Sequence, residues 1–230
     1  MSIKFVTATS IGPAHLEQQL ANQDAVKCKT SNGFWATAVA DGMGSRKFSG
    51  IGSKLAVNSA IDVCMSSSFD ISDKEIVTLI YSNWLCELKA ADISSNDAVT
   101  TLLLTWGNNK GQFRYFQLGD GEIVSNLRQL SSNETDNFSN ETTGLGISKK
   151  LSDWCIGSTC LAEDEKGITL MTDGISEDID DHVGFSSSVI SNAKSKSRRA
   201  LKKKLITLLK AWPTPNHTDD KTIAVVILND

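Results

Sequence analysis

The stretch FWATAVADGMG, residues 34–44, shows a sequence pattern that occurs again at two later points of the chain. It is an apolar run of the kind that forms a buried strand, and it ends in Asp41 and two closely spaced glycines. Asp-Gly is also a common turn signal, so this carboxylate alone indicates only a turn after a strand. Two later apolar runs end in the same way, at Asp120 and at Asp173. Three carboxylates at strand ends predict a shared site.

The composition predicts a single domain spanning residues 1–230. The chain is long enough for one well-buried core and short for two, and 40% of its residues are hydrophobic. No apolar stretch approaches the roughly 18 residues that span a bilayer, and the N-terminus lacks a secretion signal, so we expect a cytoplasmic protein without membrane contact. A net charge of -4 gives no sign of a nucleic-acid partner. Five cysteines without paired spacing favour neither a disulfide framework nor a zinc site.

The order of apolar patterns favours antiparallel sheets over a parallel one. Apolar positions at three- and four-residue steps predict helices over residues 51–66, 72–88 and 193–211, the second opening with Ser72 as a cap. Residues 129–143 are rich in Ser, Asn and Thr and predict a surface loop. Strand-like runs lie at 3–10, 24–30, 34–40, 98–106, 112–118, 122–128, 167–172 and 222–228. This order lacks the regular alternation of strand and helix that a parallel sheet requires, so helices packed outside antiparallel sheets fit better.

Convergence of several carboxylates would require a cation. Two like charges about 4 Å apart repel by roughly 4 kcal/mol at an effective dielectric constant near 20. Carboxylate oxygens, backbone carbonyls beside glycine and water are the ligands that magnesium and manganese prefer. The candidates at strand ends are Asp24, Asp41, Asp120, Asp173 and Asp219.

The ordered set of these motifs resembles the type 2C metal-dependent protein phosphatases. The matching pieces span nearly the whole chain: NQDA at 22–25, ADGMG at 40–44, TT at 100–101, LGD at 118–120, TDGI at 172–175 and DDKTI at 219–223. GPAH at 12–15 and SGIG at 49–52 are similar to a compact bacterial branch of the family. The resemblance implies an α+β fold, a four-layer α-β-β-α sandwich of two antiparallel sheets flanked by helices.

Carried across position by position, the resemblance implies a centre of two Mn²⁺ or Mg²⁺ ions. Asp41 would bridge the two ions, and the carbonyl of Gly42 would bind one of them. Asp173 and Asp219 would bind the other. Two dications lower the pKa of a bridging water and clamp the oxygens of a phosphoryl group, so no side-chain nucleophile is required.

Two further aspartates match outer positions of such a centre. Asp24 would act through metal-bound water. Asp120, together with Asp173, matches the family position of a third, weaker metal site.

The chain departs from the family pattern where the substrate phosphate binds. Many members have an arginine shortly before the Gln23 position, whereas the first arginine of this chain is Arg46. His15, Arg46 and Lys47 are the candidate phosphate-binding residues in its place. Some members also have a histidine at the position of Met43, so the group that protonates the leaving oxygen stays unassigned.

The implied function is hydrolysis of phosphoserine and phosphothreonine in proteins by direct attack of a metal-bridging water. Asp41, Asp173 and Asp219 would be the catalytic residues. The expected partners are a phosphorylated protein substrate and a cognate Ser/Thr kinase, and the protein would act as a monomer. Two alternatives stay open: a degenerate member that binds phosphoproteins or a kinase without turnover, and a hydrolase of small phosphate esters.

Residues 194–204 form the basic run of this acidic chain. Such a run could dock an acidic partner or a phosphorylated substrate, and a solvated helix face is the simpler interpretation.

Overall fold

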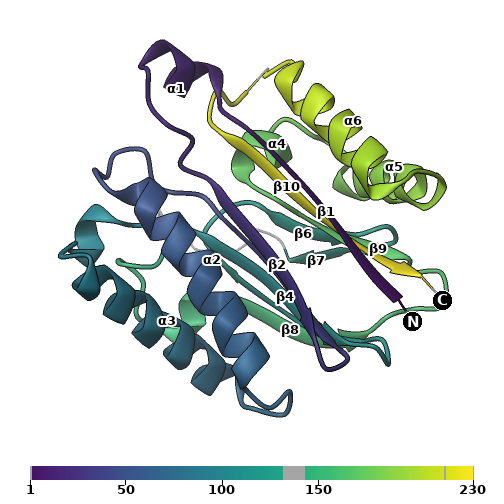
Figure 1. Cartoon of the computed structure of the whole chain (residues 1–230), viewed down its shortest axis with the longest axis horizontal. Helices are drawn as coiled ribbons and strands as arrows, with labels where there is room; N and C mark the ends of the chain where they lie inside the picture. Colours follow the sequence, from purple (N-terminus) through teal and green to yellow (C-terminus); the bar gives the residue numbers. More distant parts are fainter. Residues whose placement is uncertain (1, 132–142, 215, 230) are drawn as a thin grey trace.

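Two five-stranded antiparallel sheets pack face to face in the computed structural model, which describes residues 2–131, 143–214 and 216–229 (Figure 1). The first sheet has the order β1 (Ser2–Ser10), β10 (Lys221–Asn229), β9 (Gly167–Met171), β6 (Glu122–Ser125) and β7 (Gln129–Ser131). The second has the order β2 (Ala25–Ser31), β3 (Phe34–Ala40), β4 (Leu102–Asn108), β5 (Gln112–Leu118) and β8 (Cys155–Cys160). The described parts of the two terminal strands pair along their length, from Ser2 opposite Asn229 to Ser10 opposite Lys221.

Helices cover both outer faces of this sandwich (Figure 1). The second sheet is covered by α2 (Ser49–Ser66) and α3 (Asp73–Ala90), and the first by α5 (His182–Ser195) and α6 (Arg198–Lys210). The short helices are α1 (Pro13–Glu17) and α4 (Asp173–Ser176), with single 3₁₀ turns at Ser95–Asp97 and Leu151–Asp153. The predicted α-β-β-α sandwich is confirmed.

Strand β3 shows how the sequence builds the layers. Alternate side chains of a strand point to opposite faces of the sheet. Ala36, Ala38 and Ala40 face the core under α2 and α3. Trp35 and Val39 instead join the core between the two sheets. The small alanines let α2 approach the sheet closely, while the larger side chains fill the space between the sheets.

Several predicted boundaries were wrong. The helix predicted over 193–211 is two helices, because Ser197 caps α6 by accepting a hydrogen bond from the Ala200 amide at 3.3 Å. The run predicted at 98–106 becomes a regular strand only at Leu102, and the run at 122–128 ends at Ser125.

The sequence prediction has no counterpart for helices α1 and α4, for strands β7 and β8, or for the part of α5 before residue 193. Strand β7 replaces the start of the loop predicted at 129–143, and residues 132–142 of that loop lie outside the described residues. The Ser72 cap is confirmed, since its hydroxyl accepts from the Glu75 amide at 3.2 Å. Within the described ranges, no helix combines the length and apolar content needed to cross a bilayer.

Candidate metal centre

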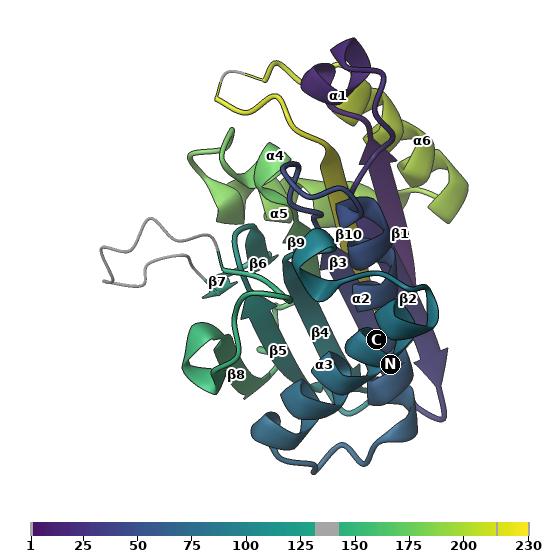
Figure 2. The ribbon, with the colours of Figure 1, turned by 90° about the vertical axis from the view of Figure 1, so that its left-hand side faces the viewer.

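One end of the sandwich brings the predicted carboxylates together. Helices α1 and α4 gather there with the loop from β3 to α2 (Figure 2). A cavity of about 160 Å³ lies at this end. Asp41, Gly42, Asp120, Asp173 and Asp219 all line it.

Backbone hydrogen bonds from the neighbouring strand fix Asp41. It directly follows β3, and residues Thr100 and Thr101 precede the adjacent strand β4. The Asp41 amide donates to Thr101 Oγ1 at 2.9 Å, and the Asp41 carbonyl accepts from Thr100 Oγ1 at 2.7 Å and from the Thr101 amide at 2.8 Å. These bonds hold the backbone, so the carboxylate is left to face the cavity.

The first sheet supplies the opposing carboxylates. Asp173 follows β9 and begins α4, and its Oδ1 accepts from the Gly174 amide at 2.7 Å. Asp219 lies just before β10, and its Oδ1 accepts from the Asp220 amide at 2.7 Å. Because β9 and β10 are paired neighbours, these two aspartates lie side by side, across the sandwich from Asp41.

Asp24 lies behind the cavity, against Asp41. It is 6% exposed, and its Oδ2 accepts from Thr172 Oγ1 at 3.0 Å. Burial raises the pKa of Asp24 to about 7, although hydrogen bonds with Asp41 and Thr222 oppose the shift. Asp24 therefore contacts Asp41 from behind the cavity, although it does not line the cavity itself.

Burial and mutual repulsion disfavour the charged forms of the cavity aspartates. Burial, together with the charges of Asp24 and Asp173, raises the pKa of Asp41 well above its usual range. Burial and the charge of Asp120 raise the pKa of Asp173. Burial also raises the pKa of Asp120, with a smaller contribution from Asp219. Such a set of carboxylates is unfavourable unless protons or cations neutralise it.

The glycines beside two of these aspartates permit close backbone contact. A Cβ on Gly42 would come within 2.6 Å of the Ser49 backbone at the start of α2. A Cβ on Gly174 would come within 2.1 Å of the Asp220 carbonyl oxygen. The glycines therefore let α2 and β10 approach the cavity, a role beyond the open access that the sequence indicated.

The residue set suits divalent cations. Its donors are carboxylate oxygens and backbone carbonyls, the ligands of Mg²⁺ and Mn²⁺. The Oδ1 atom of Asp24 is buried and has no hydrogen-bond partner within the described residues. A buried carboxylate oxygen without a partner is costly, and a cation or its water would satisfy it.

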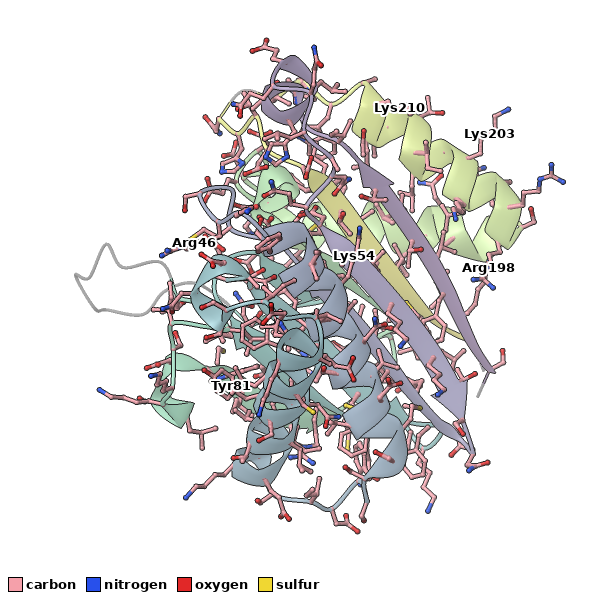
Figure 3. The ribbon with its side chains drawn as sticks, turned by 60° about the vertical axis from the view of Figure 1, so that its left-hand side comes forward. Arg46, Lys54, Tyr81, Arg198, Lys203 and Lys210 are labelled. Carbon is pink, nitrogen blue, oxygen red and sulfur yellow. The ribbon has the colours of Figure 1, made fainter. Side chains whose placement is uncertain are left out.

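The three candidate phosphate-binding residues do not line the cavity. His15 is buried, with Nδ1 at 2.9 Å from Asp220 Oδ2 and 3.6 Å from Asp219 Oδ1. The ammonium of Lys47 lies 4.9 Å from the centre of the Phe48 ring. Arg46 is half-buried on the loop between β3 and α2 (Figure 3).

Sequence reasoning missed two residues of this region. His217 lines the cavity, and Asp220 is fully buried directly behind it. Asp220 accepts hydrogen bonds from the amides of Gly12 at 2.8 Å and Gln23 at 2.6 Å. The pair of aspartates at 219–220 could have indicated Asp220. His217 lies in the segment PNHT, which shows no strand or helix pattern and so gave no sign of a functional residue.

The fold and the carboxylate set together define a sandwich protein with an acidic, cation-binding centre. A family model described as Protein phosphatase 2C matches residues 11–210. The chain therefore belongs to the protein phosphatase 2C family, whose members are metal-dependent serine/threonine phosphatases with a dinuclear metal centre. Asp219 lies beyond the matched residues, so its place in the site comes from geometry.

Solved structures of similar fold include bacterial phosphatases. PppA, a key regulatory component of T6SS in Pseudomonas aeruginosa, has a TM-score of 0.65 at 18% identity, covering 100% of this chain and 99% of that one. The catalytic domain of the serine threonine protein phosphatase PstP, in complex with 2 manganese ions, has a TM-score of 0.65 at 14% identity, covering 99% of each chain. RsbX in complex with magnesium has a TM-score of 0.62 at 15% identity, covering 99% of this chain and 96% of that one. No curated protein of similar sequence was found.

Proposed function

We propose that this chain is an active metal-dependent phosphatase that hydrolyses phosphoserine and phosphothreonine in proteins. The observation that carries the proposal is the convergence of Asp41, Asp173 and Asp219, from three separate strands, on one cavity. A member that had lost its activity would have no need to keep this unfavourable cluster of carboxylates.

Four residues would hold the two metal ions. Asp41 would bridge them, the Gly42 carbonyl would bind one, and Asp173 and Asp219 would bind the other. Asp120 and Asp173 would share a third, weaker ion. When bound, the ions would supply positive charge for the phosphoryl oxygens and activate water at neutral pH.

The protein residues themselves have positioning roles. Thr100 and Thr101 hold the Asp41 backbone through their hydroxyl groups, so these hydroxyls are engaged and neither is placed as a nucleophile. Thr172 holds Asp24 against Asp41. The Asp220 carboxylate ties the Gly12 and Gln23 backbones to the start of β10. We propose that a water molecule is the nucleophile, without a covalent enzyme intermediate.

The proposal also covers where and how the protein acts in the cell. Residues 1–230 would act as one catalytic domain, as a cytoplasmic monomer of bacterial type, on a phosphoprotein opposed by a Ser/Thr kinase. PppA, which has a similar fold, is a key regulatory component of T6SS, and this likeness supports a regulatory phosphoprotein as the substrate.

Phosphate release after treatment with chelator tests the proposal. Phosphoserine, phosphothreonine and phosphotyrosine peptides are compared with an aryl phosphate, with and without added Mn²⁺. We expect manganese-dependent release from the phosphoserine and phosphothreonine peptides. Equal release in chelator would contradict the metal mechanism, and no release by metal-loaded protein would identify a degenerate member. Release from the aryl phosphate alone would identify a hydrolase of small esters.

A further inference from the structure

A dedicated set of hydrogen bonds holds His217 at the cavity. The Asp178 carboxylate, just after α4, accepts from Trp212 Nε1 at 3.0 Å, from the Asn216 amide at 2.8 Å and from the His217 amide at 3.2 Å. The Asn216 side chain also donates to the Glu177 carbonyl at 3.0 Å. These bonds fasten the segment between α6 and β10 onto the end of α4, so His217 has a fixed place.

The imidazole of His217 presents one nitrogen to the carboxylates of the cavity. Its Nε2 lies 3.4 Å from Asp173 Oδ2 and 3.7 Å from Glu177 Oε2. Its Nδ1 is buried without a partner in the described part of the chain. Carboxylates only accept hydrogen bonds, and an unpaired buried N–H costs more than an unpaired lone pair, so we assign the hydrogen to Nε2.

His217 is chemically distinct within the cavity lining. Among the described lining residues, no other side chain contains a nitrogen donor. The remaining polar side chains are carboxylates and threonine hydroxyls, and two of those hydroxyls already contact the Asp41 backbone. A nitrogen donor placed beside an anionic phosphoryl oxygen would form a charge-assisted hydrogen bond, which is the stronger kind.

We propose that His217 is a substrate-binding residue whose Nε2–H donates a hydrogen bond to a phosphoryl oxygen. This inference rests on the proposed function, because it assumes that a phosphate ester occupies this cavity. Cations bound by Asp173 would neutralise its carboxylate, and the N–H would then be available to the anion.

A role for His217 as a metal ligand is the competing assignment. One ligand atom from each of Asp173, Glu177 and His217 lies within 4.8 Å of the other two. The two assignments differ in what a His217 substitution changes: phosphate affinity in the first case and metal affinity in the second.

Calorimetric titration separates them without relying on turnover. Mg²⁺ is titrated into chelator-treated protein, and inorganic phosphate is then titrated into the magnesium-loaded protein. The variants are His217→Ala, which removes the donor, and His217→Gln, which retains an N–H at a similar distance. His182→Ala is the matched control, because the His182 Nε2 contacts the Ser176 carbonyl at 2.9 Å and lies outside the cavity lining.

We expect His217→Ala to weaken phosphate binding by about tenfold to a hundredfold, the range for loss of a hydrogen bond to a charged group. His217→Gln should recover most of the affinity, and His182→Ala should bind phosphate like the parent protein. Magnesium affinity should be close to that of the parent protein in all three. Unchanged phosphate affinity in His217→Ala, or no phosphate binding by the parent protein, would overturn the proposal. So would a loss confined to magnesium affinity.

The same samples distinguish failure of this inference from failure of the proposed function. Phosphopeptide turnover by the parent protein is measured in parallel. Absent turnover with His217-dependent phosphate binding would reject the phosphatase activity and retain the donor. Normal turnover by the parent protein, with phosphate affinity and KM unchanged in His217→Ala, would retain the phosphatase activity and reject His217 as the donor.

Discussion

Asp219 and Asp220 are adjacent in the chain but lie in different surroundings. The Asp219 side chain is 32% exposed and lines the cavity, whereas the Asp220 side chain is fully buried beside His15. Asp220 accepts from two backbone amides, of Gly12 and of Gln23. Asp219 is therefore available to the cavity, whereas Asp220 stabilises the surrounding fold.

Alanine substitutions should separate these roles. Asp220→Ala leaves two amides without their acceptor, at about 1–3 kcal/mol each, so we expect it to lower the unfolding free energy by about 3 kcal/mol or more. Asp219→Ala should change it by less than about 1 kcal/mol while abolishing turnover. Urea unfolding of the metal-free proteins measures the difference. Equal loss of stability in both variants would contradict the assignment.

Asp41→Asn should have opposite effects on stability and on activity. Since the pKa of Asp41 is raised in the folded state, the stability that its carboxyl contributes is present at low pH and is lost as the pH rises through the folded-state pKa. At pH 8 the metal-free variant should therefore melt above the parent protein, with a smaller difference at pH 4. Turnover should fall by at least about a hundredfold, since even partners of metal ligands contribute ten- to a hundredfold. A melting temperature of Asp41→Asn below that of the parent protein at pH 8 would show that neighbouring carboxylates do not destabilise the charged Asp41.

The residues of the centre could be predicted to different degrees. Asp41, Asp120 and Asp173 stand beside glycine after apolar runs, so their strand context is visible in the sequence. His217 could not be found in this way, because hydrogen bonds to Asp178, a residue 39 positions earlier, determine its place. Long-range contacts of this kind leave no local pattern.

At the scale of elements, amphipathic segments were predictable and edge elements were not. The apolar run of β3 and the capped apolar stripe of α3 both formed as expected. Strand β8, with the sequence CIGSTC, lies at the edge of its sheet and is mostly half-buried or exposed, so it shows no apolar alternation. Helix α5 contains the polar run Ser186–Ser188, which obscures its apolar stripe.

An ion pair between Arg128 and Glu165 lies near the edge strands β7 and β8. Arg128, between β6 and β7, donates from Nε and one terminal nitrogen to the two oxygens of Glu165 at 3.1 and 3.0 Å. It also donates to the Cys160 carbonyl at the end of β8, at 3.3 Å. The arginine thereby links an edge of one sheet to an edge of the other.

The stability from this link should fall in acid. Burial alone raises the pKa of Glu165, but hydrogen bonds from Arg128, Ser125 and the Ala162 amide lower it below its ordinary value of 4.5. A lowered folded-state pKa gives stability that is present above pH 4.5 and is lost as the pH falls through the folded-state pKa. Arg128→Ala should therefore destabilise the protein near pH 7 and much less near pH 3, as followed by thermal unfolding. Arg128→Lys is the control for charge without the paired geometry, and an equal loss at both pH values would contradict the account.

Over the whole molecule, charge is distributed unevenly. Residues 194–210 contain 8 of the 23 basic residues and none of the 27 acidic ones. Arg198, Lys203 and Lys210 extend from the outer side of α6, while Arg46 lies across the molecule on the loop between β3 and α2 (Figure 3). The basic side chains of α6 are thus exposed to solvent on a helix face away from the centre, and docking of an acidic partner there stays a prediction.

Metal binding should stabilise the whole fold, because the centre joins both sheets. At metal concentrations about 100-fold above the dissociation constant, linkage adds about 2.7 kcal/mol, or about 5–10 °C in melting temperature for a chain of this size. Differential scanning fluorimetry with Mn²⁺ and with chelator measures this shift. The shift should be much smaller in Asp173→Asn and should persist in Asp70→Asn, whose aspartate is exposed and does not line the cavity. An equal shift in both variants would place the metal elsewhere.

The most direct test of the two-metal centre is an anomalous difference map from crystals grown with Mn²⁺. We expect two strong peaks in the cavity, about 3.5–4 Å apart, with Asp41 at both ions and with Asp173 and Asp219 at one of them. Density for manganese only at His15, Asp219 and Asp220, or no density in the cavity at saturating Mn²⁺, would contradict it.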